Sequence, residues 1–295
     1  MATRAAHLLI IDPQNDFCDL PVDYCPADPR GGRLAPALPV AGAHADMQRL
    51  AALIDACLGS FGAITVTLDS HQHLDIAHPT FWQDASGGPV APFTRIEAQD
   101  LDAGRFVPRN PRARERALHY LEALEASGRY SHMVWPIHCE IGTWGHAIHH
   151  DLRLACNRWE EANGSNVAKV GKGENPWTEH YSAMMAEVPD PQDPRTQLNT
   201  GLLESLRAAD QVFIAGEAGS HCVKATTEHL VANWPDAELN RLVLIEDCIS
   251  VVAGFEAHYA AFLAAMRERG VRVMRAAEVC AAIAIAVGTQ PQPAE

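Results

Sequence analysis

Short apolar runs alternate with amphipathic stretches along the whole chain. The apolar runs, such as HLLII and VFIA, are continuous, which is typical of strands that are buried on both faces. They predict strands at 7–11, 62–68, 130–135, 166–170, 211–215, 241–245 and 271–275. The stretches between them predict helices at 44–58, 112–127, 145–161, 200–209, 220–233, 255–269 and 276–286.

The alternation of strands and helices predicts an α/β fold, in which a mostly parallel sheet lies between two layers of helices. No repeat or break in composition divides the chain, so we expect one domain over residues 1–288 and a short flexible tail at 289–295. Long segments rich in proline and glycine at 18–43 and 72–111 interrupt the alternation, as does a shorter one at 189–198. Inserted loops of such length are usually functional lids or disordered.

Composition narrows the class of protein. The chain has 295 residues, 47% of them hydrophobic, and a net charge of −14, which disfavours nucleic acid and anionic membranes as partners. The longest apolar run, 279–287, is too short to span a bilayer, and the N-terminal run is too short for a secretory signal. We therefore expect a cytoplasmic protein whose eight cysteines, which form no CxxC pair, are reduced.

Reactive side chains follow five of the predicted strands. In an open parallel sheet, ligands bind outside the carboxyl ends of the strands, so residues at these ends are expected to share one edge. The residues that follow the strands are an acid, a possible metal-binding pair, a histidine, a lysine and a cysteine: Asp12, Asp69 with His71, His138, Lys172 and Cys222.

Cys222 follows Gly219 and Ser220, which predict a turn and an N-cap, so the thiol is expected in the first turn of a helix. Lowering a thiol pKa of ~8.5 by two units requires about 2.7 kcal/mol. A helix N-terminus supplies only ~0.3–1 kcal/mol, so a nearby cation is needed. Lys172 is better placed than Lys169, which lies inside an apolar run. A buried structural cysteine and a solvated lysine are the alternatives, and Asp12 could simply cap the next element.

Asp69 and His71 form a candidate metal-binding pair. Alternate residues of extended chain point the same way, and a carboxylate with an imidazole suits zinc, manganese or iron(II). His138 is the candidate third ligand. His73 and His78 could also bind the ion, but we interpret them as ordinary loop histidines. His149 and His150 are expected on a helix surface.

Five motifs carry a resemblance to a known family. LLIIDPQNDFC, VTLDSH, VWPIHCEIGTWG, KGENPWTEHYSAM and GEAGSHCVKAT follow one another in the order seen in the isochorismatase-like cysteine hydrolases, and among these the chain resembles the nicotinamidases. The motifs cover residues 8–226. The resemblance implies a three-layer α/β/α sandwich around a six-stranded, mostly parallel, Rossmann-like sheet.

The resemblance also implies roles for particular residues. It implies a catalytic triad, an oxyanion hole after a cis peptide between Glu217 and Ala218, three ligands of one divalent ion, and aromatic side chains that pack on the substrate ring. The residues are Asp12, Lys172 and Cys222 for the triad; Ala218 and Cys222 for the oxyanion hole; Asp69, His71 and His138 for the ion; and Phe17, Trp82 and Tyr181 for the ring. The ion implied is zinc, with manganese or iron as alternatives.

The implied activity is hydrolysis of nicotinamide to nicotinate and ammonia, through a thioester on the cysteine, by a homo-oligomer that serves NAD salvage. Another small amide, either ureido, carbamoyl or aromatic, is the alternative substrate. A metal-binding protein without activity is the alternative from another class. The chain departs from the family in having DSH where DWH is frequent, YSAM where YSAF is frequent, and a glutamate at Glu217.

Overall fold

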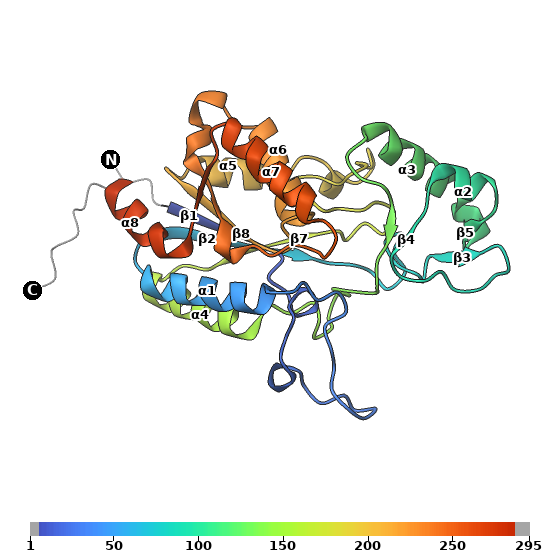
Figure 1. Cartoon of the computed structure of the whole chain (residues 1–295), viewed down its shortest axis with the longest axis horizontal. Coiled ribbons are helices and arrows are strands. Elements are labelled where there is room, and N and C mark those ends of the chain that lie inside the picture. The colour runs from blue at the N-terminus through green and yellow to red at the C-terminus, as the bar shows by residue number, and fades with distance from the viewer. Residues whose placement is uncertain (1–5, 287–295) are drawn as a thin grey trace, which may run out of the picture.

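The computed structural model describes residues 6–286, which form a central sheet covered by helices on both faces (Figure 1). The six strands run parallel in the order β10-β9-β8-β1-β2-β7. Their bounds are β1 Ala6–Ile11, β2 Phe61–Asp69, β7 Ala168–Lys172, β8 Val212–Gly216, β9 Leu242–Ile245 and β10 Arg272–Met274. The predicted α/β/α sandwich with a six-stranded parallel sheet is confirmed.

Two helical layers enclose the sheet, and each layer has its own hydrophobic core (Figure 1). One layer holds α1 (Ala43–Ala56), α4 (His150–Asn163) and α8 (Ala276–Ala286); the other holds α5 (Thr200–Arg207), α6 (Cys222–Ala232) and α7 (Glu256–Glu268). The strands β1, β8 and β9 are buried along their whole length, because both layers pack on them. Continuous apolar runs predicted these strands to within one residue.

The predicted strand at 130–135 is wrong as a member of the central sheet. Only β6 (Met133–Val134) forms there, and it pairs antiparallel with β4 (Thr94–Arg95). The apolar side chain of Val134 packs in a third core cluster, away from the two helical layers. The expectation of two buried faces also fails for β7, an edge strand whose residues are mostly exposed.

Residues 72–134 form a lobe inserted between β2 and β7 (Figure 1). The lobe contains the antiparallel pair of β3 (Trp82–Asp84) and β5 (Phe106–Pro108), with α2 (Ala98–Asp102) and α3 (Arg114–Ser127). Its own hydrophobic cluster holds it together, so much of the predicted loop 72–111 has regular structure. The other long segment, 18–43, is a loop with one turn of 3-10 helix at Val22–Tyr24.

Helix α4 begins at His150, five residues after the predicted start at 145. The residues before His150 form backbone hydrogen bonds with the loop after β1 instead of a helical turn. The N–H of Asn15 donates to the carbonyl of Ala147, and the N–H of Asp16 donates to that of Gly145. His149 is fully buried at the helix N-cap, so its predicted surface position is wrong, whereas His150 is exposed as expected.

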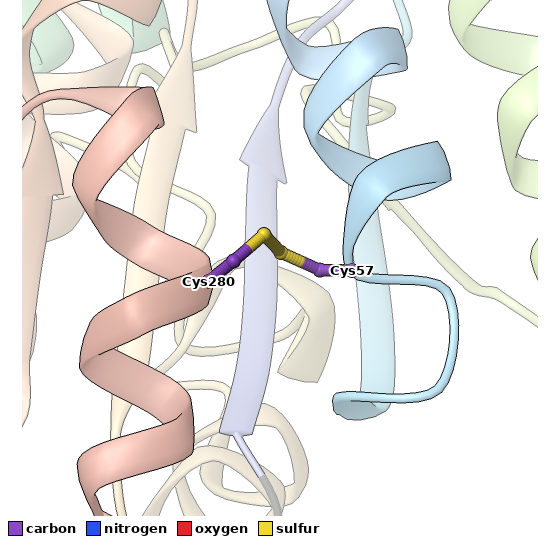
Figure 2. Close-up of a disulfide and its surroundings, with 2 residues drawn as sticks. All are labelled: Cys57 and Cys280. Carbon is purple, nitrogen blue, oxygen red and sulfur yellow. A yellow bond between two sulfur atoms is a disulfide. The ribbon is translucent and has the colours of Figure 1, made fainter. Parts of the chain in front are cut away.

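Cys57 and Cys280 form a disulfide between the end of α1 and α8, with their Cα atoms 5.7 Å apart (Figure 2). The expectation that all eight cysteines are reduced is therefore wrong for these two. The other six are free and buried. Within residues 6–286, no helix has the length and apolarity needed to cross a membrane. The predicted tail at 289–295 lies outside the described residues, and the single domain stays a prediction.

Candidate active site

The fold brings Asp12, Lys172 and Cys222 together at the carboxyl edge of the sheet. Asp12 follows β1, Lys172 ends β7 and Cys222 begins α6. All three are buried. Lys172 Nζ donates hydrogen bonds to Cys222 Sγ at 3.6 Å and to Asp69 Oδ1 at 2.9 Å, and it lies 2.9 Å from Asp12 Oδ2. A third hydrogen bond to the carbonyl of His180 uses the remaining ammonium proton.

Asp12 is fixed by strand β2. Its backbone N–H donates to Thr67 Oγ1 at 3.0 Å, and the Thr67 hydroxyl donates to Asp12 Oδ1 at 2.5 Å. One carboxylate oxygen is therefore bonded to Thr67, while the other faces Lys172. The neighbouring β8 approaches closely at Gly216, where a Cβ would lie 2.0 Å from the carbonyl oxygen of Ile11. Only glycine fits there, because its φ is +113°.

Burial and charge set the protonation of the three groups. Burial, together with the charge of Asp69, raises the pKa of Asp12 in spite of Lys172. Burial opposes the charge of Lys172, but Asp12 and Asp69 raise its pKa well above the ordinary range. Burial and the same two carboxylates raise the pKa of Cys222 well above that of a free thiol. The resting site thus holds a neutral thiol beside an ammonium.

The expectation that the pKa of the Cys222 thiol is lowered overall is wrong for the resting site. Lys172 does act in that direction, but burial and two carboxylates outweigh one ammonium. The predicted N-cap is also wrong. His221 occupies that position without a capping hydrogen bond, and the hydroxyl of Ser220 pairs with His221 Nδ1 at 2.9 Å.

The peptide between Glu217 and Ala218 is cis, as the resemblance implied. Glu217 is fully buried and its carboxylate accepts a hydrogen bond from the N–H of Ser250 at 3.1 Å. Across residues 6–286, no hydrogen bond engages the backbone N–H of Ala218 or of Cys222. Both N–H groups can therefore bind an oxyanion beside the thiol.

Three buried histidines lie next to the thiol. Nitrogen atoms of His71, His78 and His138 lie within 4.8 Å of one another. Asp69 Oδ2 is 3.1 Å from His71 Nε2 and 3.4 Å from His138 Nε2. Asp69 thus joins the histidines, and its other oxygen reaches Lys172.

The outer nitrogens of two histidines have partners that orient the rings. His71 Nδ1 lies 3.2 Å from Asp75 Oδ2, and His138 Nδ1 donates to the carbonyl of Pro136 at 2.8 Å. Their Nε2 atoms therefore face Asp69 as ligands would face an ion. His138 reaches this place although β6 is outside the sheet, because residues 139–141 pair with the backbone of His71.

The interpretation of His78 as an ordinary loop histidine is wrong. His78 is fully buried, and its Nε2 lies 3.3 Å from His138 Nδ1. The apolar residues Ile76 and Ala77 just before it were the signal in the sequence. His73 does behave as a loop histidine, because it is exposed and pairs with Glu140 Oε2 at 2.9 Å. A carboxylate with three imidazoles fits zinc, manganese or iron(II), so the residues present suit a divalent ion.

A narrow cavity of about 30 Å³ opens at the thiol. Phe17 and Tyr181 line it, as expected, but Trp82 does not. Trp82 is fully buried in the lobe, where its indole N–H donates to the carbonyl of Ile76 at 2.7 Å. Trp135 lines the cavity instead, and its indole N–H donates to the hydroxyl of Tyr181 at 3.1 Å.

Glu179 is a second lining residue that sequence reasoning missed. It is buried, and its Oε2 accepts no hydrogen bond from any residue of the part that the structure describes. Burial raises the pKa of this carboxyl group. Its place two residues before Tyr181, within the motif KGENPWTEHYSAM, was the signal available in the sequence.

Comparison with solved structures identifies the fold. The chain is similar to an Acinetobacter baumanii nicotinamidase/pyrazinamidase at 23% identity and a TM-score of 0.57, over 95% of this chain and 100% of that chain. It is similar to the yeast nicotinamidase bound to the inhibitor nicotinaldehyde at 17% identity and a TM-score of 0.61, over 92% and 99%. It is also similar to the Pyrococcus horikoshii pyrazinamidase in complex with zinc at 18% identity and a TM-score of 0.52, over 92% and 98%.

No model of a protein family matches the chain, and no curated protein does. The solved structures that match include nicotinamidases and isochorismatase-like hydrolases, so the fold expected from the motifs is confirmed. Identities of 15–23% show a shared fold, and the chemistry has to be argued from this chain's own residues.

Proposed function

We propose that this chain is a cysteine amidohydrolase that converts a small aromatic amide, nicotinamide or a close relative, to its acid and ammonia. One observation carries the proposal: a buried ammonium at Lys172 lies 3.6 Å from Cys222 Sγ and 2.9 Å from Asp12 Oδ2. A nucleophile and a base joined by a third group are the elements of thiol catalysis. The fold shared with nicotinamidases supports the same activity.

The first step forms a bond between Cys222 Sγ and the amide carbon. Asp12 takes the thiol proton as the sulfur attacks, and its raised pKa suits a base that must later release that proton. The carbonyl π electrons move onto oxygen. The N–H groups of Ala218 and Cys222 bind the resulting oxyanion, and Lys172 balances the negative charge around the sulfur.

The second step breaks the C–N bond. Asp12 gives its proton to the departing nitrogen, which leaves as ammonia, and the acyl group remains on Cys222 as a thioester. Asp12 then takes a proton from water while the water oxygen attacks the thioester carbon. The C–S bond breaks, the acid leaves, and the proton held by Asp12 returns to the sulfur.

Aromatic side chains around the thiol would hold an aromatic substrate. Phe17, Tyr181 and Trp135 line the cavity and give it an aromatic wall. Asp69 and His71, with His138 and His78, would hold a divalent ion, which supplies a positive centre that orients a pyridine nitrogen. Zinc is our first choice, since the Pyrococcus pyrazinamidase was solved in complex with zinc.

The same proposal covers the partners, the oligomeric state and the compartment of the enzyme. A net charge of −14 supports a small-molecule substrate rather than nucleic acid or an anionic membrane as partner. We propose a homo-oligomer that acts in the cytoplasm, in NAD salvage. The disulfide of Cys57 and Cys280 is an exception for that compartment, where most thiols are kept reduced.

The test is ammonia release from nicotinamide by the full chain, supplied in turn with zinc, manganese and iron(II). We expect release that disappears in Cys222→Ala and persists in Cys156→Ala, which changes a buried free thiol on α4. Pyrazinamide and a ureido amide serve as alternative substrates. A folded, metal-loaded protein that releases ammonia from none of the three would refute the proposal.

A further inference from the structure

A second and much larger cavity adjoins the cavity at the thiol. Its volume is about 490 Å³, and it shares three wall residues with the thiol cavity: Trp135, Tyr181 and His221. We call it the outer chamber. Its other wall residues are Arg95, Glu125, Gly128, Arg129, Tyr130, Ser131, Met133, Ser220, Lys224, Phe255 and His258. The three shared side chains, which we call the junction, form a common wall, so only they separate a molecule bound at the thiol from the outer chamber.

Aromatic rings surround the junction. The ring of His221 stands 5.3 Å from that of Trp135, 5.3 Å from that of Tyr181 and 4.7 Å from that of Phe255. Tyr130 stacks on His221 at 6.0 Å with an angle of 24° between the ring planes. These distances are typical of packed aromatic pairs, so a group that links the two cavities has to be flat or narrow and has to displace the rings as it enters.

Most of the charged side chains that line the outer chamber are cations. The lining holds Arg95, Arg129 and Lys224 and one acid, Glu125. Each cation also pairs with a glutamate outside the lining, and for Arg95 the partner is Glu97. The lining therefore offers ammonium and guanidinium donors to an anionic group.

The cations of the inner wall are held in place by acids behind them. Lys224 Nζ lies 3.1 Å from Glu228 Oε1 and 4.9 Å from the centre of the Tyr130 ring. Arg129 Nη2 lies 3.3 Å from Glu228 Oε2, and Arg129 Nε lies 3.7 Å from the buried Glu187. A lysine has three N–H donors and an arginine five, so donors remain for a ligand after these pairs are made.

Much of this wall comes from the inserted lobe. Arg95 lies in β4, and the wall residues from Glu125 to Met133 run from the last turn of α3 to the first residue of β6. The remaining wall comes from α6 and the start of α7, next to Cys222. The lobe thus closes the space in front of the thiol and supplies donors at a distance from it.

From this arrangement we infer that the substrate is an amide with a carboxylate-bearing substituent, which passes the aromatic junction and binds Lys224 and Arg129 in the outer chamber. The inference rests on the proposed function, since Cys222 would cleave this amide by the same acyl transfer, in which the protonated nitrogen leaves as ammonia or, where it carries the substituent, as the corresponding amine. The substituent can belong to the acyl side or to the nitrogen side of the amide. Recognition is the same on both sides: ammonium and guanidinium groups bind an anion that has several hydrogen-bond acceptors.

The test compares kcat/KM of the metal-loaded full chain on four amides. These are nicotinamide, nicotinamide with a phenyl group on its ring, the same compound with a carboxyphenyl group, and nicotinoylglycine. We expect at least one of the two carboxylated amides to exceed nicotinamide by about tenfold, which corresponds to ~1.4 kcal/mol. The carboxyphenyl compound reports on the acyl side, and nicotinoylglycine reports on the nitrogen side.

Lys224→Met tests the proposed anion contact. We expect it to lower kcat/KM for the preferred carboxylated amide by about 5- to 10-fold, with less than about a twofold change for nicotinamide and phenylnicotinamide. Lys169→Met is the matched control, since Lys169 is an exposed cation on β7 outside the outer chamber, and we expect it to change none of the four values. Thermal melting confirms that both variants are folded.

Two results separate the inference from the proposed function. If nicotinamide is cleaved and both carboxylated amides are poorer substrates, the inference is wrong and the amidase stands. Equal effects of Lys224→Met on charged and uncharged amides would also overturn it. Failure to cleave any amide would overturn the proposed function and the inference with it.

Discussion

Lys172 Nζ donates a hydrogen bond to Asp69 Oδ1 at 2.9 Å, while the other oxygen of Asp69 faces the histidines. A single carboxylate therefore connects the proposed catalytic ammonium to the proposed metal centre. Removal of Asp69 should affect both sites strongly, whereas removal of Lys172 should act mainly on the thiol chemistry and change metal affinity only as loss of an outer-shell partner does.

We expect Lys172→Met to lower kcat/KM by about 10²- to 10⁴-fold, the range for a group that assists proton transfer, and to change metal affinity by no more than ~100-fold, because Lys172 bonds to Asp69 from outside the metal site. Asp69→Asn should lower turnover as well and weaken metal binding by more than ~100-fold, the upper limit for loss of an outer-shell partner. Calorimetric titration with zinc and amide hydrolysis measure the two effects. Tight zinc binding by Asp69→Asn would contradict its assignment as a ligand.

Asp12→Asn should increase the rate at which Cys222 is alkylated. The Asp12 carboxylate raises the pKa of the thiol and Lys172 lowers it, so loss of the carboxylate lowers the pKa and increases the thiolate fraction. Iodoacetamide labelling of metal-free protein at neutral pH, followed by mass spectrometry, measures the rate. Hydrolysis should nevertheless be lost, because the base is absent. Unchanged or slower labelling would mean that Asp12 does not control the thiol.

His78→Asn should lower zinc affinity by at least about tenfold. A ring nitrogen of the buried His78 lies within 4.8 Å of ring nitrogens of His71 and His138, so the three could bind one ion. His73→Asn is the matched control: the ring of this exposed histidine pairs with Glu140, and its replacement should not change the affinity. Equal affinities of the two variants would exclude His78 from the metal site.

Substitution of Trp82 should act mainly on stability, and substitution of Trp135 should act mainly on KM. Trp82→Ala should lower the free energy of unfolding by ~3–5 kcal/mol, because a fully buried indole leaves a cavity in the lobe. Trp135→Phe should raise KM with less loss of stability, because it removes part of the cavity wall and the hydrogen bond to Tyr181. Denaturant unfolding and steady-state kinetics separate the effects. A normal KM in Trp135→Phe would remove it from the substrate site.

The residues at strand ends were predictable from sequence, because buried strands are continuous apolar runs and parallel strands place their carboxyl ends at one edge. Asp12, Lys172 and Cys222 are together for this reason. The positions of two tryptophans depend on how distant parts of the chain fold against each other. Trp82 closely follows the metal motif in sequence, yet it packs in the lobe. Trp135, which comes after the lobe in sequence, lines the cavity instead.

Electrostatics was the second limit of sequence reasoning. A lysine near a thiol predicts a lower thiol pKa, but here burial of the thiol, together with the carboxylates of Asp12 and Asp69, outweighs the effect of Lys172 and raises that pKa. His78 and Glu179 were missed for a related reason. Their burial depends on how the lobe and the segment before Tyr181 close over the site, and neither closure follows a periodic pattern in the sequence.

The Cys57–Cys280 disulfide spans 223 positions, so most of the polypeptide forms a closed covalent ring. The whole lobe, Lys172 and Cys222 lie within this ring, while Asp12 lies on the segment outside it. A protease that cuts any one loop between the two cysteines opens the ring without releasing a fragment. The nicked protein would migrate as one chain on a non-reducing gel and separate into two only after the bond is reduced.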